Sequence, residues 1–153
     1  MRRTKRLIVV GLLALVASVA GQATASTHAG TFVRCSWHTQ AQGYRYQVQG
    51  TAVGPVKCNR PFGSGRYHGR YRARVTPPTA SETGSSKLSF KTGTVQGNYH
   101  ISGRFSGSTH YPGVLRILSG SGRFKHATGS LKISCVVHIP TEACQASGTL
   151  NGI

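Results

Sequence analysis

Residues 120–135 read G-S-G-R-F-K-H-A-T-G-S-L-K-I-S-C, and this stretch indicates how the chain folds. Its first half is rich in glycine, and Ala127-Thr128-Gly129 has the composition of a turn. Its second half alternates strictly between an apolar and a polar side, with Leu131, Ile133 and Cys135 on one and Ser130, Lys132 and Ser134 on the other. Period-two alternation is typical of a half-buried β-strand. We therefore expect a turn that leads into a strand, with the other strands arranged around it.

The same alternation recurs along the chain, and no segment after residue 25 shows the 3.6-residue period of a helix. Eight strands are expected, over residues 31–37, 44–53, 66–76, 87–92, 94–106, 113–119, 130–139 and 143–152. Proline cannot donate to a strand ladder, so Pro55 and Pro61 predict a loop over residues 54–65. Small polar residues predict another loop over 79–86.

The links between the expected strands are mostly too short for a crossover helix, which predicts antiparallel neighbours in a meander. Each strand has one apolar face, so the sheet must roll onto itself or find a partner. We therefore expect an all-β fold, an eight-stranded antiparallel meander barrel. A two-sheet β-sandwich is the alternative, because strand spacing does not separate the two.

Residues 1–25 have the three parts of a secretory signal peptide. A basic start, Arg2–Arg6, is followed by 14 mostly apolar residues, Leu7–Ala20, and by the small-residue cleavage pattern Ala23-Thr24-Ala25. The apolar part is short for a bilayer span, which needs roughly 20 residues. We predict cleavage after residue 25, a single barrel domain over residues 26–153, an extracellular location, and no membrane span in the mature chain.

The four cysteines, Cys35, Cys58, Cys135 and Cys144, are an even number in a chain predicted to be exported. Such a set indicates disulfides. Of the possible pairings we expect Cys35–Cys58 and Cys135–Cys144. The second pair flanks Pro140-Thr141, where a hairpin turn would place the two cysteines opposite each other within disulfide distance. The alternative, a zinc site, lacks the C-x₂-C spacing common in such sites.

The mature chain is strongly basic. Residues 26–153 contain 15 Lys and Arg, two Glu and no Asp, which gives a formal charge of +13. Charge of one sign and this size favours association with polyanions such as nucleic acid, anionic lipid headgroups or acidic cell-wall polymers. The alternative interpretation is a charged surface that only keeps an exported protein in solution.

The segment 66–76 concentrates this charge on one face. Its alternate residues are the polyanion-binding candidates Arg66, His68, Arg70, Arg72 and Arg74. Alternate residues of a strand lie about 6.6 Å apart, close to the phosphate spacing of an extended nucleic acid. Tyr67 and Tyr71 fall on the opposite face, so they could not stack on bases held by the arginines. We therefore expect an anionic polymer or cell surface as the partner, and no specific nucleic-acid binding.

The apolar faces of the strands would line the barrel interior. An eight-stranded barrel leaves room for side chains or for one small ligand. The aromatic candidates for lining this lumen are Tyr46, Tyr67, Tyr71, Tyr99 and Phe105. A small apolar ligand in the lumen is therefore a second expected partner.

The scarcity of acidic residues limits the chemistry. Without Asp, a Ser-His-acid triad could draw only on Glu82 and Glu142, and both fall in expected loops. Paired-carboxylate hydrolysis would require these two residues to meet in space. The histidines lack metal-ligand spacing, and we expect no metal site and no cofactor. One alternative is Cu(II) or Ni(II) binding by the N-terminus that cleavage would create, Ser26-Thr27-His28.

The segment Gly120–Leu131 resembles the allene oxide cyclase and dirigent barrel group, whose small secreted bacterial members often carry a G-x-G-x-F-x-x-A-T-G pattern before a late strand. Residues 115–119 and 148–152 also fit this group. The resemblance implies an eight-stranded antiparallel barrel with an apolar lumen and, as in plant relatives, a homo-oligomer (a trimer). Lys125 and His126 stand where the pattern usually has smaller residues. The plant cyclases use a lumenal polar set that includes Glu, and no catalytic residue is carried over from them to this chain.

These observations predict a secreted, disulfide-stabilised, cationic β-barrel that acts as a non-enzymatic binding module. It would hold a small apolar ligand in its lumen or an anionic surface on its arginine face. The alternative, implied by the resemblance alone, is an isomerase or cyclase that acts on an apolar substrate.

Overall fold

The computed structural model describes residues 30–42, 49–104, 110–138 and 140–153. Within them the chain forms eight strands and no helix: β1 (Thr31–Gln42), β2 (Gln49–Cys58), β3 (Ser64–Thr76), β4 (Thr79–Phe90), β5 (Gly93–Arg104), β6 (His110–Gly122), β7 (Thr128–His138) and β8 (Thr141–Asn151). Accordingly, this part of the chain has no helix long and apolar enough to cross a membrane. The predicted signal peptide and the Ser26-Thr27-His28 segment lie outside the described residues, so cleavage and secretion stay predictions.

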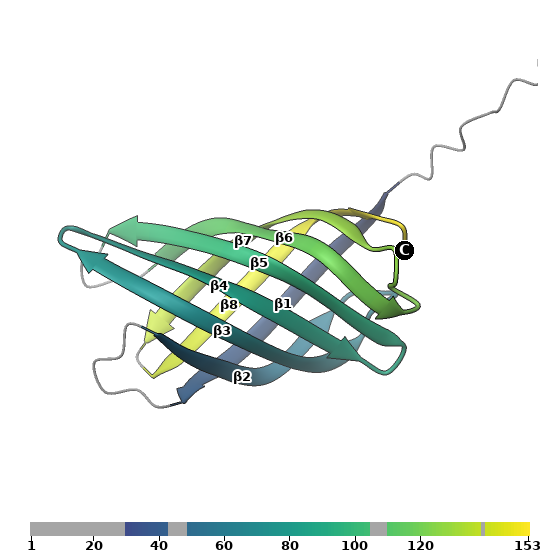
Figure 1. Ribbon diagram of the computed structural model, residues 1–153, viewed down its shortest axis with the longest axis horizontal. Coiled ribbons are helices and arrows are strands. Elements are labelled where there is room, and N and C mark those ends of the chain that lie inside the picture. Colours follow the sequence, from purple (N-terminus) through teal and green to yellow (C-terminus); the bar gives the residue numbers. More distant parts are fainter. Residues whose placement is uncertain (1–29, 43–48, 105–109, 139) are drawn as a thin grey trace, which may run out of the picture.

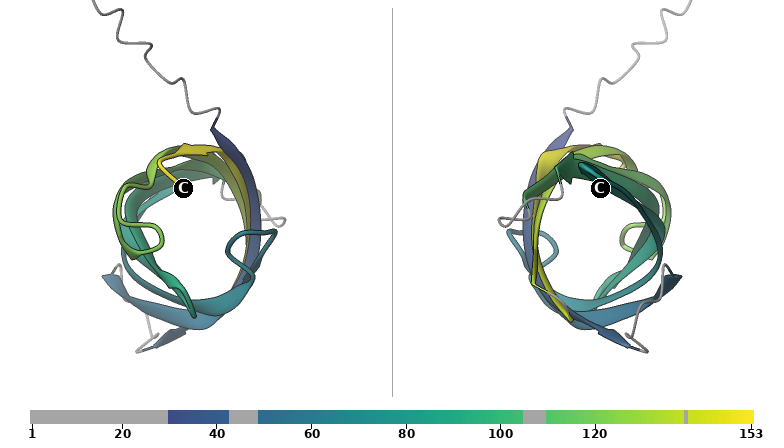
Figure 2. Two further views of the ribbon diagram at one scale, coloured as in Figure 1. Left: turned by 90° about the vertical axis from the view of Figure 1, so that its right-hand side faces the viewer. Right: turned by 90° about the vertical axis from the view of Figure 1, so that its left-hand side faces the viewer.

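The eight strands close into one barrel (Figures 1 and 2). Each strand pairs antiparallel with its neighbours in sequence, and β8 completes the ring by pairing with β1, from Thr31 opposite Leu150 to Gln40 opposite Thr141. The predicted meander barrel is confirmed. The β-sandwich alternative is wrong, because hydrogen-bonded neighbours follow one another around the whole ring.

The stretch that predicts the fold joins β6 to β7. Its loop is held by hydrogen bonds from the backbone N–H groups of Phe124 and Ala127 to carbonyl groups three residues earlier. Beyond the loop the predicted alternation is confirmed. The inward side chains are buried and their outward neighbours are exposed, with Leu131, Ile133 and Cys135 on the inside and Ser130 and Lys132 on the outside.

Three phenylalanines fill one end of the barrel, which we call the aromatic end. Phe62 comes from the loop between β2 and β3, Phe90 from the end of β4, and Phe124 from the loop between β6 and β7. The rings of Phe62 and Phe124 stack with centroids 4.3 Å apart, and Phe90 meets Phe124 edge-on at 5.9 Å. Phe124 has no exposed surface, so packed rings occupy this end.

β2 continues to Cys58 and β3 begins at Ser64, so the loop expected over residues 54–65 is confined to residues 59–63. β2 pairs with β3 at Pro55 opposite Arg66, but its ladder with β1 has a gap between Val53 and Val56. Proline has no N–H to donate. Pro55 is tolerated because it lies at this gap.

The second expected loop, residues 79–86, is also wrong, since β4 begins at Thr79. Small polar side chains conceal the alternation there. Inward positions hold small or polar residues in place of large apolar ones, namely Ala80, Glu82, Gly84 and Ser86. The β3–β4 hairpin projects past the rest of the barrel (Figure 1). Val75 lies in this projection and is 50 % exposed, although its parity predicts an inward position.

The pairing of β5 with β6 changes register between Gln96 and Gly97. Gln96 lies opposite Ser119 and Gly97 lies opposite Ile117, so Leu118 is an extra residue on β6. Such a β-bulge bends the strand and increases its twist. It also explains why Leu118 is 54 % exposed. Glycine is required at position 97, because a Cβ there would collide with the carbonyl oxygen of Arg116.

Both predicted disulfides are present. Cys35–Cys58 links β1 to β2, and Cys135–Cys144 links β7 to β8. Each joins two residues that lie directly opposite each other on neighbouring strands. Two disulfides are consistent with an extracellular protein.

Candidate functional site

Both glutamates of the chain lie inside the barrel, at the end opposite the aromatic end. On β4, Glu82 shares the inward face with Leu88, and on β8, Glu142 shares it with Cys144. The expectation that both occupy loops is therefore wrong. β4 and β8 both begin at this end (Figure 1), so the glutamates reach it from separate parts of the wall. We call it the acidic end and define it by Thr39, Glu82, Tyr99, Tyr111 and Glu142.

Each carboxylate accepts a hydrogen bond from a buried hydroxyl. Tyr99 Oη on β5 donates to Glu82 Oε1 over 2.6 Å, and Thr39 Oγ1 on β1 donates to Glu142 Oε2 over 3.4 Å. The first distance is in the range of charge-assisted O–H···O⁻ bonds. Thr39 and Tyr99 are buried, whereas both glutamates are half-buried. The donor residues are therefore more deeply buried than the glutamates that accept from them.

Burial raises the pKa of both glutamates. For Glu142, burial and then the charge of Glu82 raise the pKa from 4.5 to about 7, and the hydrogen bond from Thr39 partly opposes the shift. For Glu82, burial also raises the pKa, against the hydrogen bond from Tyr99. The effect of Glu82 on Glu142 places the two carboxyl groups within electrostatic reach of each other. Near neutral pH, Glu142 is present in both its protonated and its ionised form.

Two buried tyrosines complete the polar cluster. Burial raises the pKa of Tyr67, and the charges of Glu142 and Glu82 raise it further. Burial likewise raises the pKa of Tyr99, with additional effects of Tyr67 and both glutamates. Both phenols therefore stay protonated at neutral pH, and Tyr99 donates its hydrogen bond to Glu82. The Tyr67 ring stacks on Trp37 with centroids 5.4 Å apart. Because β1 and β3 are not neighbours, this stack spans part of the lumen.

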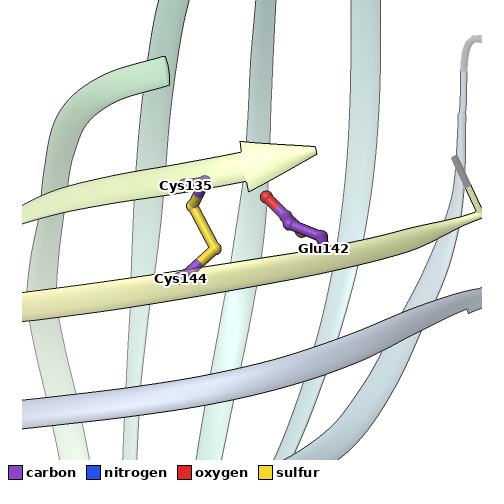
Figure 3. A group of neighbouring side chains, drawn as sticks. All are labelled: Cys135, Glu142 and Cys144. Atoms are coloured by element: carbon purple, nitrogen blue, oxygen red, sulfur yellow. A yellow bond between two sulfur atoms is a disulfide. The ribbon is translucent and has the colours of Figure 1, made fainter. Parts of the chain in front are cut away.

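Glu142 also lies beside the Cys135–Cys144 disulfide (Figure 3). A carboxylate oxygen of Glu142 and the two sulfur atoms all lie within 4.8 Å of one another. Three such donors could hold a metal ion if both cysteines were thiolates. Here the two sulfur atoms are bonded to each other, which leaves Glu142 as the single charged donor. The disulfide fixes the start of β8 against β7 and so positions Glu142.

The predicted lumen residues fall into two groups. Tyr67, Tyr71 and Tyr99 are buried inside the barrel. Tyr46 and Phe105 lie outside the described residues. The structure places Tyr99 at the acidic end, hydrogen-bonded to Glu82. Tyr99 therefore has a polar role, whereas the sequence predicted only that it lines an apolar lumen.

The polyanion-binding candidates lie on the opposite side of the wall. All five are exposed on the outer face of β3, which we call the basic strip: Arg66, His68, Arg70, Arg72 and Arg74. Arg72 Nη2 donates to Gln49 Oε1 on β2 over 3.4 Å. Because inward and outward residues alternate along β3, the strip and the acidic end face different surroundings and form two separate candidate sites.

Sequence reasoning missed the glutamates because it assigned them to loops. The alternation of inward and outward residues along each strand is the signal that could have found them. Glu82 is six residues before Leu88 and Glu142 is two residues before Cys144, so each shares its face with a residue expected inside. Extending the two strands by a few residues toward their N-terminal ends places both carboxylates in the lumen.

No protein-family model matches the chain, and no curated protein matches it. Among solved structures, the chain is similar to pyocyanin demethylase, with a TM-score of 0.49 and 14% sequence identity. The match covers 77% of this chain and 98% of that one. It is a distant structural neighbour, and the resemblance to the allene oxide cyclase and dirigent group stays a prediction.

Proposed function

We propose that the acidic end binds a small organic ligand, which presents a protonated nitrogen or another hydrogen-bond donor to Glu82 and Glu142. The observation that carries this proposal is a pair of half-buried glutamates inside a barrel whose other inward side chains are mostly apolar or aromatic. The protein then acts as a binding module. The sequence led us to expect a small apolar ligand. The ligand proposed here has an apolar part and also a hydrogen-bond donor.

The placement of the glutamates supports a role other than stability. Moving an ionised carboxylate into a protein interior is costly. All the Lys and Arg residues that the structure describes are exposed on the outside, where a glutamate would find favourable neighbours at little cost. Both glutamates are instead inside, away from these cations. A ligand that supplies the missing positive charge would recover part of that cost.

The outer cations also restrict how a ligand reaches the acidic end. A permanent cation is repelled by the overall positive charge until it comes within a few ångströms of the carboxylates. A weakly basic amine avoids this repulsion, because it approaches in its neutral form. At the site it takes the proton from the Glu142 carboxyl group, and the resulting ammonium and carboxylate form an ion pair.

A pair of isosteric probes tests the proposal. Benzylammonium presents a protonated nitrogen with N–H donors at both pH values used, and ethylbenzene has nearly the same shape without charge. Their binding is measured by calorimetry and by the fluorescence of Trp37, at about pH 5.5 and about pH 8. We expect the cation to bind roughly tenfold more tightly at the higher pH, since Glu142 is then ionised, and the neutral probe to show no pH dependence.

Matched variants assign the effect to the carboxylates. Glu82→Gln and Glu142→Gln should each weaken binding of the cationic probe, and the double variant should abolish its preference over the neutral probe. Thr83→Ala is the control, because Thr83 neighbours Glu82 and is exposed on the outer wall. Equal affinity for both probes, or an unchanged preference in the double variant, would contradict the proposal.

A second candidate function is an isomerase that moves a proton on the bound molecule. The pKa of Glu142, raised to about 7, favours it, because a general base works best with a pKa near the working pH. In this case Glu142 would remove a proton from one carbon of the ligand and return it to another, so that the double bond moves. Incubation of a bound ligand in D₂O separates the two functions. Deuterium enters the ligand only if the protein is an enzyme, and Glu142→Gln should stop the exchange.

A further inference from the structure

The barrel separates its charges by sign. The sequence contains no Asp, and both of its glutamates face the lumen. Among the described residues every Lys and Arg is exposed, so the charged side chains of the outer wall are all cations. The outer wall therefore carries a positive field that no side-chain carboxylate interrupts, which attracts polyanions and raises their association rate.

The basic strip is the densest part of this wall. Its side chains repeat at every second residue of β3, a step of about 6.6–6.8 Å. The neighbouring strands frame it with hydroxyl and amide groups. On β4, Ser81, Thr83, Ser85, Lys87 and Ser89 lie directly opposite its members, and on β2, Gln49 and Thr51 lie opposite Arg72 and Arg70. The strip therefore combines a line of guanidinium groups with uncharged groups that donate and accept hydrogen bonds.

This composition favours a saccharide over a nucleic acid. Proteins that bind single strands stack bases on aromatic side chains, but the tyrosines of β3, Tyr67 and Tyr71, are buried inside the barrel. The exposed Phe32 lies on β1, two strands away. Serine, threonine and glutamine side chains can instead hydrogen-bond the hydroxyl groups of sugars. Guanidinium groups bind sulfate, phosphate or carboxylate in a two-point geometry.

We infer that the basic strip binds an anionic polysaccharide, with successive acidic groups of the polymer on Arg66, Arg70, Arg72 and Arg74. The serine and threonine hydroxyls of β4, together with Gln49 and Thr51 of β2, contact the sugar units between these acidic groups. The polymer lies along β3 on the outer wall, so binding does not depend on the acidic end or on any ligand there.

Heparin is the probe for this inference, and two triple variants of equal charge are compared. Arg70→Ser, Arg72→Ser and Arg74→Ser together remove the centre of the strip. Arg116→Ser, Lys125→Ser and Lys132→Ser remove three exposed cations from β6, the following loop and β7. Circular dichroism and thermal unfolding first establish that both variants keep the fold. Affinity is then measured by calorimetry over a series of salt concentrations.

We expect the strip variant to bind heparin roughly 30-fold more weakly at about 0.1 M salt and to show a smaller salt dependence, as the loss of about three anion contacts predicts. The control variant should lose less than about threefold, through long-range charge alone. Equal losses in the two variants would overturn the inference, since net charge rather than the strip would then explain binding. Tighter binding of a single-stranded oligonucleotide than of heparin would overturn it in favour of a nucleic acid.

Discussion

At the residue scale, Glu142 combines three constraints in one side chain. It accepts a hydrogen bond from Thr39, it lies beside a disulfide, and it shares the acidic end with a second carboxyl group. Its raised pKa has a direct cost. The folded protein holds the Glu142 proton more tightly than the unfolded chain does, so the ionised form opposes folding.

Glu142→Gln tests this cost. The folded pKa of about 7 lies above the ordinary value of 4.5, so stability from this group falls as pH rises between these values. The variant should match the original protein near about pH 4 and exceed it by about 1–2 kcal/mol at about pH 8, a figure reduced for partial solvent screening. Urea unfolding followed by Trp37 fluorescence measures the difference.

The control for this measurement is Gln145→Ala, an exposed position on the same strand. It should leave the pH dependence of stability unchanged. If Glu142→Gln and the original protein lose stability in parallel between about pH 4 and about pH 8, the raised pKa of Glu142 is refuted.

Single residues also mark how far the sequence predicts the site. The exposure of the basic strip follows from its alternation with Tyr67 and Tyr71. The aromatic side chains belong inside the barrel, so the charged side chains between them face outward. The inward position of Glu82 does not follow in the same way. The residues on the same face of β4 as Glu82 are small and give no apolar signal: Ala80, Gly84 and Ser86. The composition of this strand is therefore that of a loop.

At the scale of elements, each disulfide links two neighbouring strands. The position of Cys135–Cys144 was predictable from the spacing around a hairpin turn, whereas Cys58 fell in a segment expected to be a loop. Cys135–Cys144 connects residues nine apart in sequence, and Cys35–Cys58 connects residues 23 apart. In the chain-entropy model a cross-link stabilises by restricting the unfolded chain, and a longer loop gives more stabilisation.

Replacing each cysteine pair by alanine tests this ordering. Each loss should cost about 2–4 kcal/mol, and loss of Cys35–Cys58 should cost about 0.8 kcal/mol more than loss of Cys135–Cys144. Urea unfolding of the two double variants gives the comparison, with mass spectrometry to establish that the remaining disulfide is intact. The reverse order would show that native-state packing, rather than loop length, decides the contribution.

Element boundaries were the weakest part of the sequence prediction. β2 passes through Pro55 because its ladder with β1 has a gap there, and a gap in pairing leaves no trace in composition. The bulge at Leu118 is similar, since it depends on the register between β5 and β6. Local sequence therefore predicts that strands exist, while their ends and irregularities depend on partners distant in the chain.

At the scale of the whole molecule, the barrel has two unlike ends. The aromatic end is packed with phenylalanine rings, and the acidic end holds the two glutamates and the hydroxyl groups that donate to them. The Trp37–Tyr67 stack lies between them. The closed barrel was predictable from the strand count and short links. The difference between its ends was not, because both glutamates fall in segments expected to be loops and two of the three phenylalanines reach the lumen from loops.

Phe124→Ala probes the aromatic end. Phe124 is fully buried and packs against Phe62 and Phe90, so its truncation should cost about 3–5 kcal/mol. Leu118→Ala is the control at an exposed apolar position, with an expected change below about 0.5 kcal/mol. Thermal unfolding measures both, and Phe124→Leu provides a milder variant if Phe124→Ala does not fold. A cost below about 1 kcal/mol would mean that the rings contribute little to the core.

The closure of β8 onto β1 has a consequence for how this protein meets other molecules. A sheet with a free border can be extended by a strand from another chain, which is a common route to peptide capture and to fibre growth. Within the residues that the structure describes, each strand of this ring has a neighbour on both sides, so no strand offers a free border along which another chain could pair. Recognition therefore depends on side chains, and surface substitutions can change which molecule binds without altering the hydrogen bonds between the strands.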